Sequence, residues 1–170
     1  PAPEAIPVEV IEKAFDEVVH SNPMSLLQYG PMQGDARLAE LTLKRLVKTH
    51  KMNPEGQGLI ISNGAGQLLG LVPITVLEPG DEVYMDEFTF TSAINSVRNM
   101  GGKALGIKTD EHGMIPSELE KAAQSGKGKY IYLIPNFQNP TGITMPLERR
   151  KEIYAIASKY DLFIYEDDPY

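Results

Sequence analysis

Short apolar runs alternate with segments of helical periodicity along most of this 170-residue sequence. The runs are rich in β-branched and aromatic residues and lack polar alternation, which is typical of strands buried on both faces. Strands that alternate with helices are joined by right-handed crossovers and form a mostly parallel sheet. The sequence therefore predicts an α/β fold with three layers, α/β/α, around a mostly parallel sheet.

The expected elements follow from the two periodicities. Strands are predicted at 58–62, 82–87, 103–109, 129–135 and 162–166, and helices at 8–19, 36–50, 66–76, 92–100, 147–160 and from residue 116 onward. The helix at 66–76 should break or end near Pro73, and Ser117 with Glu120 matches a capping box. We expect an N-terminal helical segment, 1–50, that leads into a large domain, 51–170, incomplete at its C-terminal end.

Composition narrows the classes of function. The net charge of −7 and the pI near 5.0 argue against nucleic-acid binding through a basic face. Cysteine is absent, and the three histidines are far apart in sequence, so no metal site is expected. No apolar run is long enough to span a bilayer and no signal-peptide pattern opens the chain, so the cytoplasm is the expected compartment.

The loops that follow strands deserve the closest inspection, because ligands of open α/β sheets bind beyond the carboxyl ends of the strands. The first such loop, "SNGAGQLLG", passes from strand to helix through Gly64 and Gly66. Two interpretations are open. The glycines serve close packing, or they let the backbone approach a phosphate at the positive end of the helix.

The second loop contains Phe88 and Phe90 in "DEFTFTSA". Both rings are interpreted either as core residues or, for one of them, as a surface on which a flat ligand stacks. The third loop, "IPNFQNPTGITMP", offers the amides of Asn136 and Asn139 beside a turn at 140–142. Here Asn139 is the candidate ligand contact, and Asn136 is assigned to turn chemistry.

The fourth loop is "YEDDPY", in which three consecutive acids, 166–168, end an apolar run. A carboxylate in such a place is costly unless it is paired, so one of the acids is expected to face a cation or a protonated nitrogen, and the others to be solvated. Together the four loops match a ligand with a phosphate, a flat ring, a ring oxygen and a basic ring nitrogen. Pyridoxal 5'-phosphate has all four features, and its ring nitrogen needs a carboxylate partner.

The sequence resembles the fold-type I pyridoxal-phosphate-dependent aminotransferases of class I/II. Within them it is most similar to the branch that contains aromatic-amino-acid, 2-aminoadipate and kynurenine aminotransferases. The resemblance rests on "QYGPMQGDARLAELTLKRL", "SNGAGQLLGL", "DEFTFTSAI", "PNFQNPTG" and "ERRKEIYAIASKYDLFIYEDDPY", in this order over essentially the whole chain. It implies that the chain is part of the large domain of such an enzyme.

The resemblance also implies a role for individual residues. Ala65 and Gly66, with Gly64 forming the turn, would hold the cofactor phosphate through backbone N–H groups. Phe90 would stack on the pyridine ring. The remaining contacts would be Asn139 and Tyr170 with the ring oxygen, Asp167 with the pyridine nitrogen, and Tyr29 with the cofactor phosphate of the partner subunit in a homodimer.

Two departures from the family pattern affect this expectation. Family members usually carry a hydroxyl residue where Ala65 stands. The lysine that forms the Schiff base and the arginine that binds the substrate carboxylate follow, in the family, after the position of Tyr170. The lysines present here, such as Lys44, Lys121 and Lys151, fall on predicted helices and are expected to be solvated, so no catalytic residue is assigned within the chain.

The expected function of the parent protein is transamination between an amino acid, aromatic or 2-aminoadipate-like, and a 2-oxo acid. The isolated chain would be inactive. Three alternatives remain open: an effector-sensing domain of a transcriptional regulator, a lyase or cyclopropane-carboxylate synthase on the same fold, and, more remotely, a nucleotide-binding doubly wound domain. The last gives Asn139 and Asp167 no obvious task.

Overall fold

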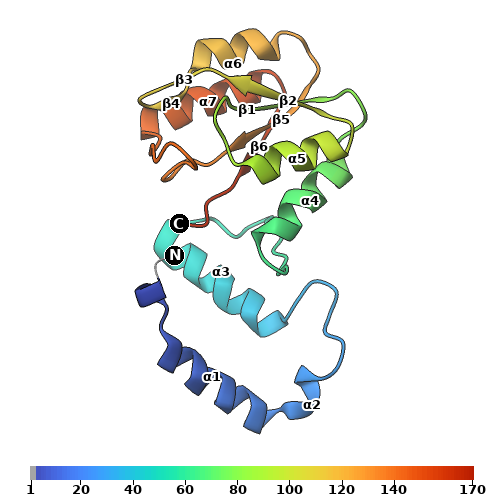
Figure 1. The fold of residues 1–170 in the computed structure, drawn as a ribbon, viewed down its shortest axis with the longest axis vertical. Coiled ribbons are helices and arrows are strands. Elements are labelled where there is room, and N and C mark those ends of the chain that lie inside the picture. The colour runs from blue at the N-terminus through green and yellow to red at the C-terminus, as the bar shows by residue number, and fades with distance from the viewer. Residues whose placement is uncertain (1–2) are drawn as a thin grey trace. The chain divides into compact units, whose positions relative to one another are not determined.

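The computed structural model describes residues 3–170, and these form two compact units that meet in the chain at Ser62 and Asn63 (Figure 1). The first unit is helical, with η1 (Pro3–Ala5), α1 (Val8–Ser21), α2 (Pro23–Leu26) and α3 (Ala36–His50). Helix α3 begins where the Asp35 carboxylate accepts a hydrogen bond from the Leu38 N–H at 2.7 Å, which satisfies one of the free donors of the first turn. The short α2 did not follow from the periodicity.

The strand predicted at 58–62 is wrong. This segment is extended but belongs to no sheet among the described residues, and the Ile60 side chain is 61% exposed. Its backbone bonds instead to a turn, since the Ile61 N–H donates to the Gln33 carbonyl at 3.1 Å. An apolar run predicts a strand only where another strand lies beside it, and here that neighbour is a turn.

The second unit contains the sheet and the helices that cover it. Its elements are α4 (Ala65–Val76), β1 (Glu82–Asp86), α5 (Thr91–Asn99), β2 (Lys103–Ile107), β3 (Thr109–Asp110), β4 (Gly113–Met114), α6 (Pro116–Ala123), β5 (Gly128–Leu133), α7 (Leu147–Lys159) and β6 (Phe163–Glu166). The main sheet has the order β2-β1-β5-β6 and is parallel throughout. The predicted α/β class and parallel sheet are confirmed.

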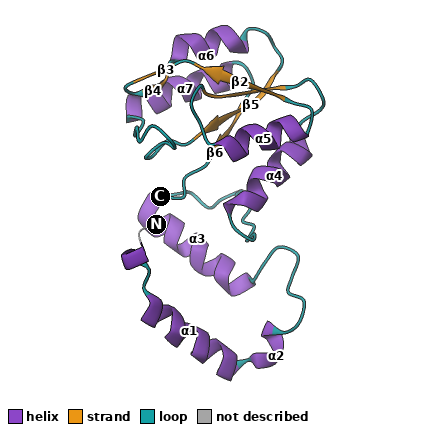
Figure 2. Cartoon of the chain, viewed as in Figure 1, coloured by secondary structure: helices purple, strands orange, loops and turns teal. Residues whose placement is uncertain are grey.

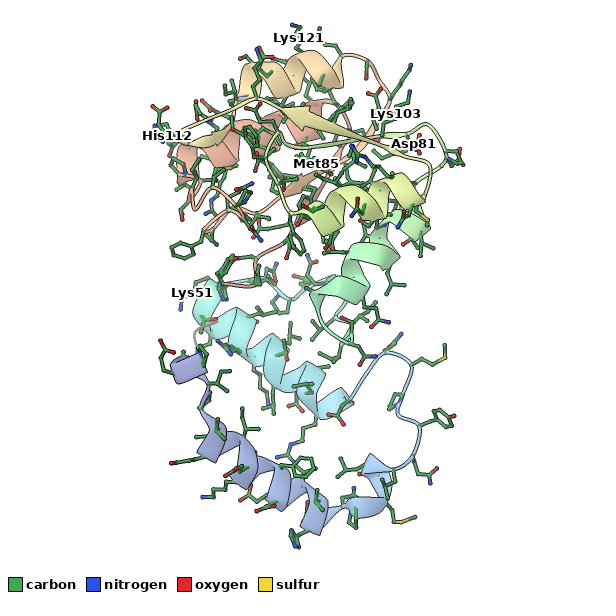
Figure 3. The ribbon with its side chains drawn as sticks, in the orientation of Figure 1. Lys51, Asp81, Met85, Lys103, His112 and Lys121 are labelled. Carbon is green, nitrogen blue, oxygen red and sulfur yellow. The ribbon has the colours of Figure 1, made fainter. Side chains whose placement is uncertain are left out.

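Helices cover the sheet on both faces, which gives the three predicted layers (Figure 2). Along β1, Val83 and Met85 enter a core with α4 and α5, whereas Tyr84 enters a second core with α6 and α7. Strand β5 alternates in the same way, with Tyr132 in the first core and Ile131 in the second. Figure 3 shows Met85 inside the unit and Lys121 on the outer side of α6. Both central strands are thus apolar on successive residues because both of their faces are buried.

Two expectations about helix ends are wrong. Helix α4 runs through Pro73 to Val76, and Pro73 itself is buried. The Thr75 hydroxyl donates to the Leu71 carbonyl within this last turn. At α6 the N-cap is Ile115 and Pro116 occupies the first turn, so Ser117 lies inside the helix and makes no capping box. A proline in the first turn fixes the helix start where its missing N–H costs nothing.

Candidate functional site

A cavity of about 270 Å³ opens beyond the carboxyl ends of the parallel strands, within the second unit. The N-terminal part of α4 and three loop segments reach it, those after β1, after β5 and after β6. Its lining comprises Ala65, Gly66, Leu69, Phe90, Ser92, Ile134, Asn139, Asp167, Pro169 and Tyr170. The cavity therefore brings together six of the candidate residues that the sequence singled out.

The N-terminus of α4 forms one wall of the cavity. Gly64 is the N-cap and has a φ of 82°, a conformation that side chains rarely adopt, so glycine is needed for the turn itself. Gly66 is different, because it lies within the helix without a positive φ, and a Cβ added there would meet no described atom within 4 Å. Packing within the chain does not demand glycine at this position. The open space beside the first N–H groups of the helix suits a close-approaching anion.

Phe90 supplies an aromatic wall. It is half-buried, caps α5 and lines the cavity. Phe88, by contrast, has a side chain that is 61% exposed, and it contributes a backbone carbonyl to the loop rather than a ring to the cavity. Of the two aromatic residues considered from the sequence, only Phe90 lines this cavity.

The loop that carries Asn139 is held by the buried Gln138. The Gln138 Nε2 donates to the Phe88 carbonyl at 2.6 Å and to the Asp86 Oδ2 at 3.2 Å. Its Oε1 accepts from the Thr141 N–H at 2.9 Å and from the Thr141 hydroxyl at 2.7 Å. One buried amide thus ties the loop after β1 to the loop after β5, and so relates the positions of Phe90 and Asn139.

Asn136 bridges two charged groups. Its Oδ1 accepts from the Arg150 Nη2 at 2.7 Å, and its Nδ2 donates to the Asp168 Oδ2 at 2.7 Å. The guanidinium also donates to the carbonyls of Pro135 and Met145. Asn136 therefore bonds to groups outside the turn to which its sequence position assigned it. Asp168 accepts from this amide and is also exposed, as expected of an acid that does not face the ligand.

Asp167 is fixed at its backbone and at its side chain. Its N–H donates to the Leu133 carbonyl at 2.8 Å, and its Oδ2 accepts from the Tyr132 hydroxyl at 2.7 Å. The side chain is half-buried and lines the cavity. At the mouth, Tyr170 lies edge-on to Phe137, with ring centroids 5.9 Å apart.

The buried Asp86 carboxyl lies at the end of β1. It is 5% exposed, and its Oδ1 has no hydrogen-bond partner among the described residues. Burial raises the pKa of Asp86 to about 6, while the hydrogen bond from Gln138 opposes that shift. The end of β1 therefore contains a buried carboxyl with a pKa of about 6, bonded to the Gln138 side chain that holds the Asn139 loop.

Sequence reasoning missed Tyr132, Gln138 and Asp86. Each acts through a partner remote in the chain, so no local spacing marks it. The one available signal for Gln138 is its position between Asn136 and Asn139, in the loop that was predicted to contact a ligand.

Tyr29 lies in the first unit and is fully exposed. Lys44, Lys121 and Lys151 lie on α3, α6 and α7 with exposed side chains, as expected. Within residues 3–170 no group of three potential metal ligands lies together. Across the same residues, no helix is long and apolar enough to cross a membrane.

The cavity combines a helix N-terminus, an aromatic wall, an amide and an oriented carboxylate, on a parallel α/β frame. Such a site suits a flat ligand that carries an anion at one end and a basic nitrogen at the other. The family model for aminotransferase class I and II matches residues 2–170. The chain belongs to this family, as its sequence motifs indicated.

Individual relatives agree with this assignment. The chain is 31% identical to the aromatic-amino-acid aminotransferase 1 of Thermococcus litoralis, over 100% of this chain and 42% of the relative. It superposes on a kynurenine aminotransferase of Pyrococcus horikoshii, solved with PMP and with KYN and KYA, with a TM-score of 0.94 and 32% identity over 99% of this chain.

A third relative is the alpha-aminoadipate aminotransferase of Thermus thermophilus, solved with N-(5'-phosphopyridoxyl)-L-leucine. It matches with a TM-score of 0.87 and 31% identity, over 100% of this chain and 42% of that one. The Pyrococcus horikoshii match likewise extends over 43% of the solved chain. The chain therefore spans less than half the length of these relatives.

Proposed function

We propose that the full-length protein is a pyridoxal-phosphate-dependent aminotransferase that exchanges an amino group between an amino acid and a 2-oxo acid. The observation that carries this proposal is the single cavity in which a helix N-terminus, an aromatic ring and an oriented carboxylate meet. Family membership supports the reaction class. The cavity lining, rather than the fold alone, argues for the cofactor.

The residues present fit the cofactor. Ala65 and Gly66, after the turn at Gly64, would bind the phosphate through backbone N–H groups, in the open space beside Gly66. Phe90 would stack on the ring, and Asp167 would bond to the ring nitrogen. Asn139 and Tyr170, which line the same cavity, would bond to the ring oxygen.

Bound pyridoxal phosphate supplies an electron sink for charge that develops at the substrate Cα. Asp167 serves this chemistry by holding the proton on the ring nitrogen. Phe90 fixes the plane of the ring, and Gln138 holds the two loops that bear Phe90 and Asn139. The family resemblance assigns the Schiff-base lysine, which is also the base at Cα, to sequence that follows Tyr170.

For the amino substrate we propose an aromatic or 2-aminoadipate-like amino acid. The support comes from the relatives, which include aminotransferases named for aromatic amino acids, kynurenine and alpha-aminoadipate. We further propose a homodimer in which Tyr29 reaches the cofactor phosphate of the partner subunit, and a cytoplasmic location, to be checked by fractionation of cells that express the tagged protein.

The test uses the purified full-length protein. Addition of pyridoxal phosphate should produce a visible absorbance band, and tyrosine or 2-aminoadipate with 2-oxoglutarate should give glutamate. Asp167→Ala should abolish glutamate formation and weaken the binding of the cofactor. A protein that binds no cofactor would overturn the proposal, and one that binds cofactor without turnover of any amino acid would indicate a sensor domain instead.

A further inference from the structure

Tyr132 contacts the carboxylate on which the proposed site depends. This residue lies on β5, is 1% exposed, and donates its hydroxyl proton to the Asp167 Oδ2 at 2.7 Å. The backbone of Asp167 is held one position further along the same strand, by the Leu133 carbonyl. Strand β5 therefore holds Asp167 at two points, one on the main chain and one on the side chain.

The Tyr132 ring has a fixed orientation. It packs edge-on against Tyr165 of β6, with ring centroids 5.6 Å apart and an interplanar angle of 81°. Burial first, and then the hydrogen bond to Asp167, raise the pKa of the Tyr132 hydroxyl above its ordinary value. The hydroxyl therefore keeps its proton at neutral pH and can donate it to Asp167.

We propose that Tyr132 is a positioning residue for Asp167. The Tyr132 hydroxyl occupies the Asp167 Oδ2 and leaves the Asp167 Oδ1 for the nitrogen of a bound pyridine ring. This inference rests on the proposed function. The hydrogen bond from Tyr132 fixes the orientation of the Asp167 carboxylate. A carboxylate held in this way would bond to the ring nitrogen and keep the proton on it.

A merely structural role for Tyr132 predicts a different result from this positioning role. If Tyr132 only fills the core, its loss disturbs every ligand of the cavity to the same degree. If it acts through Asp167, its loss matters only to a ligand that presents a ring nitrogen. The two roles are therefore separated by comparing pyridoxal phosphate with its analogue that has carbon in place of the ring nitrogen.

The experiment measures the dissociation constants of both ligands for the full-length apoprotein, by quenching of protein fluorescence. The variant is Tyr132→Phe, which keeps the ring and removes the hydroxyl. Its matched control is Tyr130→Phe, since Tyr130 lies on the same strand, is also 1% exposed, and belongs to the same core as Tyr132. Asp167→Asn, alone and combined with Tyr132→Phe, completes a double-mutant cycle.

We expect Tyr132→Phe to weaken the binding of pyridoxal phosphate about tenfold, because one charge-assisted hydrogen bond to Asp167 is lost. The binding of the carbon analogue should weaken less than about twofold. Tyr130→Phe should change neither dissociation constant. In a protein that already carries Asp167→Asn, adding Tyr132→Phe should not weaken the binding of pyridoxal phosphate further. Equal losses for both ligands, or no loss for either, would overturn the inference. A wild-type protein that binds no pyridoxal phosphate would instead overturn the proposed function, so the two failures are distinguishable.

Discussion

Asp86 shows how one buried carboxyl affects the stability of the whole second unit. One of its oxygens accepts from Gln138, and the other has no partner among the described residues. A buried carboxylate with an unpaired oxygen is costly, so the carboxyl keeps its proton to a higher pH than usual, and its pKa is about 6. The energetic cost of ionising it therefore grows as the pH rises from the ordinary pKa of 3.8 to about 6.

The first prediction concerns Asp86→Asn. The folded pKa of about 6 exceeds the ordinary value of 3.8, so the folded state binds the proton more tightly than the unfolded state. The contribution of Asp86 to stability is then greatest below about pH 4, falls between about pH 4 and 6, and is constant above. Asparagine cannot ionise, so the variant should gain up to about 3 kcal/mol relative to the wild type across that interval.

Urea unfolding of the cofactor-free full-length protein at pH 4, 5, 6 and 7 measures the difference. Glu111→Gln, at an exposed turn, is the control and should follow the wild type. Parallel pH curves for the wild type and Asp86→Asn would show that Asp86 ionises in the folded protein as freely as in the unfolded one.

A second prediction at the residue scale concerns Ala65, where the family resemblance implies a hydroxyl residue. Ala65→Ser adds a donor beside the proposed phosphate position at the start of α4. One additional hydrogen bond to the charged phosphate should tighten the binding of pyridoxal phosphate about three- to tenfold. Pyridoxal, which lacks the phosphate, is the control ligand, and an equal gain for both ligands would contradict a phosphate contact at residue 65.

Among the elements, α7 is tied to the small β3–β4 hairpin by Arg149. Its guanidinium donates to both Asp110 oxygens at 3.0 Å and to the carbonyls of Gly113 and Met114 at 3.2 and 2.8 Å. The side chain is largely buried, with 13% of its surface exposed. A two-residue hairpin has little stability of its own, so these bonds hold it against the helix.

The third prediction is that Arg149→Ala lowers the free energy of unfolding by about 2–4 kcal/mol, because it removes the hydrogen bonds that the guanidinium donates to a carboxylate and two carbonyls. Arg149 lowers the pKa of Asp110, so this part of the stability is present above the ordinary pKa of an aspartate and is lost as the pH falls. The difference in the free energy of unfolding between the wild type and Arg149→Ala should therefore become smaller at acidic pH.

Denaturation at pH 7 and at pH 3.5 checks this expectation. Arg149→Lys retains the charge but not the fork that bonds both oxygens, so it should fall between the other two proteins. A gap that is the same at both pH values would mean that packing rather than the ion pair accounts for the loss.

The elements also show what the sequence could predict. Strands β1, β5 and β6 and helices α5 and α7 were predicted within two residues, because each strand is a short apolar run and each helix has apolar residues at helical spacing. The segment 58–62 failed because a strand needs a neighbour, and the hairpin was missed because strands of two residues have no period. In the cavity, Asn139 and Asp167 were found through local motifs, whereas Tyr132 and Gln138 act on residues 35 and 52 positions away.

At the scale of the whole molecule, the first unit leaves apolar side chains exposed. On α1 these are Val8, Val10, Ile11, Phe15 and Val18, each at least 46% exposed. A helix with one apolar face normally buries that face. Tyr29, the proposed contact to a partner's cofactor, belongs to the same unit, so the dimer proposal is best tested between subunits.

The fourth prediction is complementation between subunits. Tyr29→Phe and Asp167→Ala should each weaken cofactor binding, while mixed dimers of the two variants should regain one intact site, about a quarter of all sites after random exchange. Cofactor absorbance after mixing and re-equilibration measures this recovery. If both residues serve a site within one chain, mixing restores nothing.

The strand order β2-β1-β5-β6 also has a consequence for how the protein folds. Strand β1 pairs with β2, the next strand in the chain, and also with the more distant β5, while β6 joins only through β5, as in the pairs Tyr84–Ile131 and Ile131–Ile164. Such non-local parallel pairs form slowly, after local helices. The nascent chain must therefore emerge from the ribosome as far as β6 before Asp167 has a place to occupy, and affinity for the cofactor should be among the last properties that a newly made molecule acquires.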